Sequence, residues 1–159
     1  MSLHFQIDLA FDFKDDTSVN IIYGLENLSN NKPLTDQQKK HLPKILETEI
    51  KGITDNLSFV GRDIFYFRKH YRSTTKGIDI YKWTFHLRTM FSDDVFYEDG
   101  YPLLAWLALQ SHTRGFVGYI KEEFDAIPRL IYFDNGEVTI QESADKVIKY
   151  SYSDFDTKY

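Results

Sequence analysis

The chain of 159 residues contains no cysteine. This absence excludes disulfide frameworks, thiolate nucleophiles, and zinc or iron–sulfur sites with cysteine ligands. It also fits a protein of a reducing compartment. A chain of this length that folds as one domain buries roughly 68–70 % of its unfolded surface. We therefore expect a hydrophobic core, without cross-links or metal ions, to hold the fold together.

Long apolar segments and a targeting sequence are also lacking. The longest apolar run, residues 103–109, is far shorter than the roughly 20 residues that span a bilayer. Residues 1–8 contain no basic segment followed by an apolar one, so the sequence predicts no signal peptide. We expect a cytoplasmic protein without a membrane partner.

Basic charge is not in excess. The formal net charge is −5, whereas nucleic-acid-binding domains usually carry a positive net charge or one basic face. The composition therefore argues against nucleic acid as the main partner.

No motif of a catalytic or cofactor site is present. The segment Gly115-Phe116-Val117-Gly118 lacks the third glycine and the acidic partner of a dinucleotide site, and no P-loop lysine follows it. Close approach of a neighbouring strand or helix explains Gly118 better. No His-Glu-x-x-His zinc pair and no Gly-x-Ser-x-Gly nucleophile turn occurs. The five histidines are His4, His41, His70, His86 and His112. We therefore expect neither a metal nor a cofactor.

Two clean alternations of apolar and polar residues predict β-strands with one buried face, at 4–13 and at 79–91. Helices are predicted at 19–26, at 35–53 and at 103–111, with Thr35 as a cap and Pro43 near the start of the second helix. Shorter strands are predicted at 64–67, 116–120, 130–133 and 138–140, with turns at 73–77 and 134–136.

These strands cluster instead of alternating with helices, which favours an α+β fold. We predict a mainly antiparallel sheet with helices packed on one face, and a ferredoxin-like core with additions is one version of it. Residues 1–150 form a single domain in this prediction, and residues 151–159 form a frayed polar tail.

Three segments of the C-terminal half carry a resemblance to other proteins. They are Leu103-Leu104-Ala105-Trp106-Leu107, Gly115-Phe116-Val117-Gly118-Tyr119 and Pro128-Arg129-Leu130-Ile131-Tyr132-Phe133. Together with the opening strand and Asp16-Thr17, they resemble small uncharacterised bacterial and phage proteins. The resembling segments are structural, so the resemblance supports the fold prediction and implies no activity.

One candidate site lies on the polar faces of the two alternating strands. His86 and Arg88 share one face of the second strand, and His4 and Asp8 share one face of the first. If the two strands are neighbours, these side chains converge, and an acid–base pair there could transfer protons. An open sheet face that carries ordinary solvated polar residues is the alternative interpretation.

A second candidate is the basic run that ends at Arg72. Arg68, Lys69 and Arg72 alternate with aromatic residues, a pattern that can hold single-stranded nucleic acid or a phosphorylated ligand. The acidity of the chain counts against nucleic acid, and a solvated hairpin end is the alternative.

The leading functional hypothesis is a non-enzymatic interaction module, such as an accessory or inhibitor protein of a bacterium or phage. Tyrosine is abundant, and four carboxylates near Tyr97 and Tyr101 suit contact with a basic partner. These carboxylates are Asp93, Asp94, Glu98 and Asp99. A second copy of the chain is another candidate partner, which would make a homodimer. The alternative function is a small-ligand-binding protein or an enzyme that uses His4, Asp8, His86 and Arg88.

Overall fold

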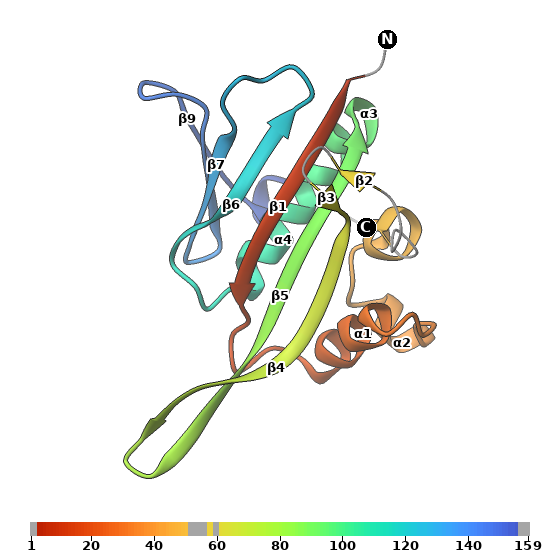
Figure 1. Cartoon of the computed structure of the whole chain (residues 1–159). Helices are drawn as coiled ribbons and strands as arrows, with labels where there is room; N and C mark the ends of the chain where they lie inside the picture. Colours follow the sequence, from red (N-terminus) through yellow and green to blue (C-terminus); the bar gives the residue numbers. More distant parts are fainter. Residues whose placement is uncertain (1–2, 51–56, 59–60, 156–159) are drawn as a thin grey trace.

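The computed structural model describes residues 3–50, 57–58 and 61–155. Its main feature is a seven-stranded antiparallel sheet with the strand order β4-β5-β1-β6-β7-β8-β9 (Figure 1). The strands of this sheet are β1 (His4–Asp12), β4 (Ile64–Thr75), β5 (Ile78–Ser92), β6 (Gly115–Glu122), β7 (Arg129–Asp134), β8 (Glu137–Gln141) and β9 (Val147–Ser151). A separate ladder joins β2 (Leu57–Ser58) to β3 (Gly61–Arg62).

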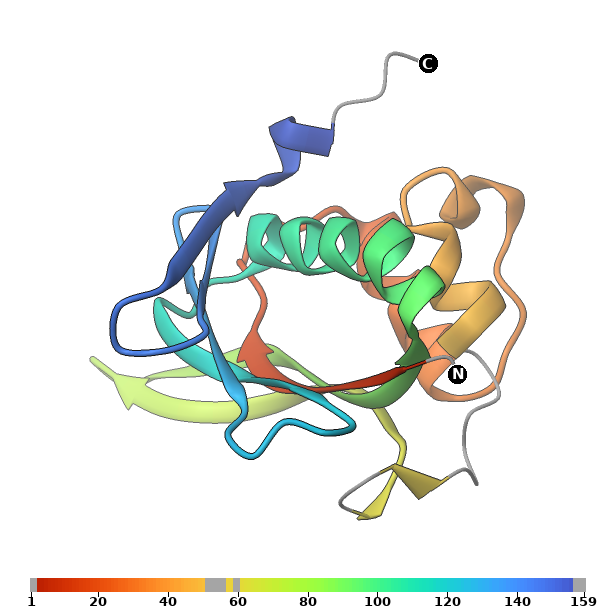
Figure 2. The ribbon, with the colours of Figure 1, turned by 90° about the horizontal axis from the view of Figure 1, so that it is seen from above.

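Helices cover one face of the sheet, and the sheet curves around one of them, α4 (Figure 2). The α-helices are α1 (Val19–Ser29), α2 (Asp36–Lys39), α3 (Asp93–Val95) and α4 (Tyr101–Gln110). Wider π-type turns occupy Leu46–Ile50 and Phe96–Gly100, and a 3₁₀ turn occupies Tyr152–Phe155. The α+β prediction, with an antiparallel sheet and helices on one face, is confirmed.

The first four strands of the large sheet have the arrangement of a ferredoxin-like core. The chain runs β1-α1-β4-β5-α4-β6, and these strands lie in the order β4-β5-β1-β6 with antiparallel neighbours. Strands β7, β8 and β9 then extend the sheet beyond β6 as a meander. The additions to the core are therefore these three strands at one edge, together with α2 and the β2–β3 ladder between α1 and β4, and α3 between β5 and α4.

The core forms between the inward face of the sheet and α4. Phe5, Ile7 and Leu9 of β1 are at most 1 % exposed, and six consecutive residues of α4 from Leu103 to Ala108 are buried. Each large apolar side chain buried in this way contributes about 1.5–3 kcal/mol. Because the sheet wraps around α4, this helix has no need of a polar face, as its sequence predicted.

Strand β4 is longer than the sequence predicted. It pairs with β5 from Ile64 to Thr75, with one irregularity between Tyr71 and Ser73, so the predicted turn at 73–77 is too long. The turn consists of Lys76 and Gly77 alone, with φ of 51° and 75°. Two such residues with positive φ form the tight turn that suits the twist of a hairpin.

The helix predicted from Thr35 to Ile53 is interrupted. Thr35 and Gln38 form the predicted capping box, but α2 ends at Lys39. Pro43 has no N–H to donate and disfavours helical geometry in the residue before it, so the next helical turns begin after it and run to Ile50. Residues 51–53 of the prediction lie outside the described residues.

Regular structure also continues beyond residue 150, where the sequence predicted the start of a frayed tail. Strand β9 pairs with β8 from Val147 to Ser151, and the Ser151 N–H donates to the Asp154 carboxylate at 2.8 Å. The Phe155 ring contacts Tyr150 edge-on, with 5.5 Å between centroids. These contacts hold residues 151–155 as a strand end and a 3₁₀ turn, where a frayed tail was expected.

Gly118 of β6 provides the close approach that its sequence context predicted. A Cβ atom at this position would overlap the carbonyl oxygen of Asp8 and lie 2.6 Å from the Cα of Leu9. Both atoms belong to the backbone of β1 and have no room to move. We expect Gly118→Ala to lower the free energy of unfolding by about 3 kcal/mol, measured by urea denaturation.

Gly24→Ala in α1 is the matched control for this substitution. A Cβ atom at Gly24 would lie 2.6 Å from the end of the Leu42 side chain, which can rotate, and its contact with Gln38 Cβ, at 3.5 Å, is an ordinary one. Alanine also favours helix over glycine by about 1 kcal/mol. We expect this variant to stay within about 1 kcal/mol of the wild type. Equal losses for both variants would contradict the tight β1–β6 contact.

Candidate functional site

The outward face of the sheet carries a polar cluster centred on Asp8. Strands β1 and β5 are neighbours, and their register places Asp8 opposite Arg88. Arg88 Nε donates to Asp8 Oδ2 at 2.7 Å, and His86 Nε2 lies 3.0 Å from Asp8 Oδ1. The Tyr119 hydroxyl of β6 donates to the same carboxylate at 3.5 Å. The structure therefore brings three of the four predicted residues together.

His4 is the predicted residue that the structure leaves apart. It lies at the start of β1, where its Nδ1 is 3.2 Å from the Glu123 carboxylate. His4 is four residues from Asp8 along an extended strand, where each residue advances the chain by about 3.4 Å. It therefore belongs to the end of the sheet and not to the Asp8 cluster.

The electrostatics of the cluster keep Asp8 ionised. Burial by itself raises the pKa of the Asp8 carboxyl, but hydrogen bonds from His86 and Arg88, and the charges of both, outweigh it and lower this pKa. Burial and the Asp8 charge also raise the pKa of the Tyr119 hydroxyl, which stays protonated. A carboxylate that accepts from three side chains is suited to joining strands β5, β1 and β6.

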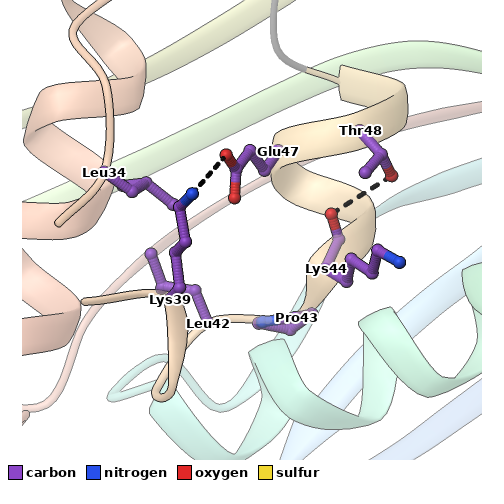
Figure 3. A pocket seen from close by; sticks show the side chains of 7 residues that line it. All are labelled: Leu34, Lys39, Leu42, Pro43, Lys44, Glu47 and Thr48. Atoms are coloured by element: carbon purple, nitrogen blue, oxygen red, sulfur yellow. Dashed lines mark hydrogen bonds and ion pairs between the residues drawn. The ribbon is translucent and has the colours of Figure 1, made fainter. Parts of the chain in front are cut away.

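Three hollows of the described surface lie away from this cluster. The first, beside α2, has a volume of about 430 Å³ and is shown in Figure 3. The second, of about 380 Å³, lies between the loops that precede β7 and follow β8, and is lined by Ile127, Pro128 and Ala144 among others. The third, of about 410 Å³, is lined by Lys14, Ser111, His112, Arg114 and Asn135. Asp8, His86 and Arg88 line none of these three.

The second candidate surface is the outer end of the β4–β5 hairpin, residues 68–82, which we name the arm. The β1–β5 pairing ends at Asp12 and Thr84, whereas β4 and β5 remain paired as far as Thr75 and Ile78. Figure 1 shows the hairpin projecting past the end of β1 and away from the helices. Apart from the Arg68–Thr84 and Lys69–Trp83 pairs at its base, the arm therefore pairs only with itself among the described strands.

Ion pairs fix the root of the arm to the segment at the end of β1. Arg72 donates to Asp12 from Nε at 2.9 Å and from Nη2 at 2.6 Å, and Lys82 Nζ lies 2.8 Å from Asp15. Burial raises the pKa of Asp12, but the Arg72 and Thr84 hydrogen bonds outweigh it and lower this pKa. Arg72, which the sequence offered as a ligand-binding residue, is therefore already used within the fold.

Arg68 and Lys69, the other two predicted residues, are exposed. Among the described residues neither has an ion pair with a carboxylate. The Arg68 guanidinium lies 5.8 Å from the centre of the Tyr66 ring, and Lys69 Nζ lies 5.6 Å from the centre of the Tyr81 ring. Both distances fall within the range of cation–π contacts.

The arm also carries exposed Tyr71, an aromatic residue of the predicted pattern, and three residues outside that pattern, Lys76, Ile78 and Tyr81. Tyr71 is 54 %, Ile78 68 % and Tyr81 47 % exposed, and Lys76 stands at the turn. The sequence prediction placed residues 73–77 in a turn and residues 79–91 in the next strand, so the basic run that ends at Arg72 was not joined to residues 76–82 in one site. The Lys76-Gly77 pair was the signal for one long hairpin.

The acidic patch of the sequence analysis lies on another part of the molecule. Asp93 and Asp94 are on α3, and Glu98 and Asp99 are on the π-type turn that joins it to α4. Tyr97 is 57 % exposed, whereas Tyr101 packs against the core. Figure 1 shows α3 and the arm at opposite ends of β5.

Comparisons of the chain with family models, with curated proteins and with solved structures give no match. The resemblance of the C-terminal half to small bacterial and phage proteins therefore stays a prediction. Within the described residues, no helix has the length and apolar character that a membrane crossing requires. In the same part of the chain, no three His, Asp or Glu side chains are placed to hold a metal ion.

The Asp8 cluster predicts a pH-dependent loss of stability. Because the pKa of Asp8 is lowered by folding, its contribution is complete above the unfolded pKa of about 3.9 and is lost as the pH falls through the lower folded-state pKa. We expect Asp8→Asn to reduce the free energy of unfolding at pH 7 by about 1–3 kcal/mol. The difference from the wild type should shrink when urea denaturation is repeated at pH 3.

Asp15→Asn is the control for this measurement. It removes an ion pair of similar length, but the Asp15 side chain is 76 % exposed. Exposed pairs contribute about 0–1 kcal/mol, so this variant should stay close to the wild type. A loss of stability at Asp8 no larger than that at Asp15 would contradict a cross-strand role for the cluster.

Proposed function

We propose that the protein is a non-enzymatic interaction module, and that it binds an acidic surface of a partner protein with the arm. The observation that supports this most directly is that the arm combines exposed aromatic and aliphatic side chains with exposed cations. A hairpin projects from the body with exposed Tyr71, Ile78 and Tyr81, and with Arg68, Lys69 and Lys76 exposed beside them. Tyrosine and arginine are the residues most enriched where binding energy concentrates in protein interfaces.

The charge distribution supports a protein partner over a nucleic acid. The arm holds five cations and one carboxylate, Asp79, and so has a formal charge of +4. Since the whole chain has a formal charge of −5, the remaining residues sum to −9. A long polyanion lying along the arm would also meet this acidic body. A folded partner with a local acidic groove can contact the arm alone.

The rigidity of the arm supports the same proposal. Arg72 and Lys82 are paired with Asp12 and Asp15, so the root is fixed before a partner arrives. On the outer part, the Thr74 hydroxyl lies 2.8 Å from the Tyr71 hydroxyl and donates to Asp79 at 2.6 Å. A surface that is already ordered loses less entropy on binding than a flexible loop does.

The alternative, an enzyme or small-ligand protein on the polar sheet face, has less support. Asp8, His86 and Arg88 do converge, which favours it. However, the Asp8 oxygens already accept from protein groups, and the three hollows described above lie elsewhere. A substrate would have to displace these bonds, and none of the three hollows offers it an enclosed site beside Asp8.

The arm proposal predicts that a charge reversal abolishes partner capture. Wild-type protein and the variant R68E/K69E/K76E are immobilised, and proteins bound from a lysate of the source organism are quantified by mass spectrometry. We expect the proteins enriched by the wild type to fall about tenfold or more with the variant, because three cations of the interface are reversed. Capture by the wild type should also weaken as salt is raised.

The matched control is K32E/K40E/K44E, which reverses three exposed lysines near α2. It should capture the same proteins as the wild type, and all three proteins should melt at similar temperatures. A partner set that survives the arm variant would sink the proposal. Retention of nucleic acid alone, abolished by the arm variant, would identify a nucleic-acid arm instead.

A further inference from the structure

The hollow lined by Lys14, Ser111, His112, Arg114 and Asn135, which we name the basic hollow, lies outside the surface assigned to the proposed function. Its lining contains two cations, an imidazole and an amide, and no carboxylate. We infer that it binds a phosphate group, either as the free anion or on a small organic monoester. This inference does not depend on the arm proposal.

Three distant segments of the chain build the basic hollow. Lys14 follows β1, residues 111–114 follow α4, and Asn135 lies in the turn between β7 and β8. The first two segments are joined by backbone hydrogen bonds of 2.8 Å, from Lys14 N–H to the Gln110 carbonyl and from His112 N–H to the Asp12 carbonyl. The positions of Lys14 and Arg114 therefore follow from the main chain and not from flexible loops.

The turn that supplies Asn135 is also fixed. Asn135 and Gly136 have φ of 49° and 80°, the conformation of a tight two-residue hairpin turn between β7 and β8. Gly136 lies so close to α4 that a Cβ atom there would be 3.1 Å from the Leu109 side chain. The backbone of Asn135 is thus held at the rim of the basic hollow, next to the end of α4.

The cations of the basic hollow are available to a ligand. Lys14 has no ion pair among the described residues. Arg114 has only a loose one, with 3.7 Å between its Nε and an Asp134 oxygen, and both side chains are more than two-thirds exposed. Exposed pairs of this kind contribute little, so an anion with better geometry can replace Asp134.

The hollow beside α2 shows the opposite arrangement at similar volume. Figure 3 shows the Lys39 side chain turned towards Glu47, with 3.5 Å between Nζ and Oε1, and Leu34, Leu42 and Pro43 in the remaining lining. One of its two cations, Lys39, is paired with a carboxylate within the site, and its surface is mainly apolar. It therefore serves as the comparison site for the basic hollow.

The chemical class of the ligand follows from the hydrogen-bond donors that line the basic hollow and from the volume of this hollow. A guanidinium, an ammonium and an amide N–H₂ group offer only donors to a ligand oxygen, and guanidinium matches phosphate geometry with two parallel bonds. Two cations balance a phosphate dianion better than a carboxylate with one charge. The volume of about 410 Å³ lies in the range of small-molecule sites and leaves room for an organic group.

The test is to titrate the full chain with inorganic phosphate, phenyl phosphate and acetate at constant ionic strength. Binding is monitored by the NMR chemical shifts of the backbone amides. We expect saturable shifts at residues 14, 111–114 and 135–136 with both phosphates, and weaker binding of acetate. The variant K14A/R114A should weaken phosphate binding by about tenfold or more, because both charge-assisted contacts are lost. The control K39A/K44A removes two cations from the hollow beside α2 and should bind as the wild type does.

Each outcome decides the inference. Inorganic phosphate that binds as tightly as phenyl phosphate identifies the free anion as the ligand, and tighter binding of phenyl phosphate identifies a monoester. Three results would overturn the inference. They are chemical-shift changes that spread over the arm cations, acetate binding equal to that of phosphate, and equal weakening of phosphate binding by both double variants. Since neither variant changes the arm, partner capture reports separately on the proposed function.

Discussion

Strand β1 carries the interaction on which the rest of the structure depends, because it pairs with β5 on one side and β6 on the other. Its inward side chains, Phe5, Ile7 and Leu9, are at most 1 % exposed and form the floor beneath α4. Its outward carboxylates, Asp8 and Asp12, accept hydrogen bonds from side chains of β5 and β4. One strand thus joins the hydrophobic core to the polar face, since successive side chains of a strand point to opposite sides.

The arm is a consequence of where β1 ends. Strand β1 has nine residues and β5 has fifteen, so the hairpin continues after its neighbour has stopped. The chain leaves the sheet there because the Thr17 hydroxyl donates to the Lys14 carbonyl and Ser18 caps α1. Asp12 and Asp15, at this exit, hold Arg72 and Lys82 of the arm. The same exit places Lys14 at the basic hollow, so both proposed binding surfaces are positioned by one end of one strand.

Hydrophobic periodicity predicted the parts of the fold that have one buried face. The alternation in β1 and β5 predicted two strands and, once these are neighbours, the convergence of Asp8, His86 and Arg88. It predicted the β5 side of the arm from residue 79 but not the β4 side beyond residue 67, because that part of β4 is largely exposed and its ladder is held by backbone hydrogen bonds that leave no apolar pattern. The basic hollow was not predictable either, since its lining comes from segments that only the sheet topology brings together.

Amide hydrogen exchange tests the central role of β1 most directly. Amides in the middle of β1 lie between two paired strands over a buried face, so they should exchange only when the whole protein unfolds. Amides of the arm near Lys76 lie in a two-stranded ribbon open to water, and they should exchange much faster through local opening. If the β1 amides exchange as fast as those of the arm, then β1 does not organise the fold, and this account of the arm and the basic hollow is wrong.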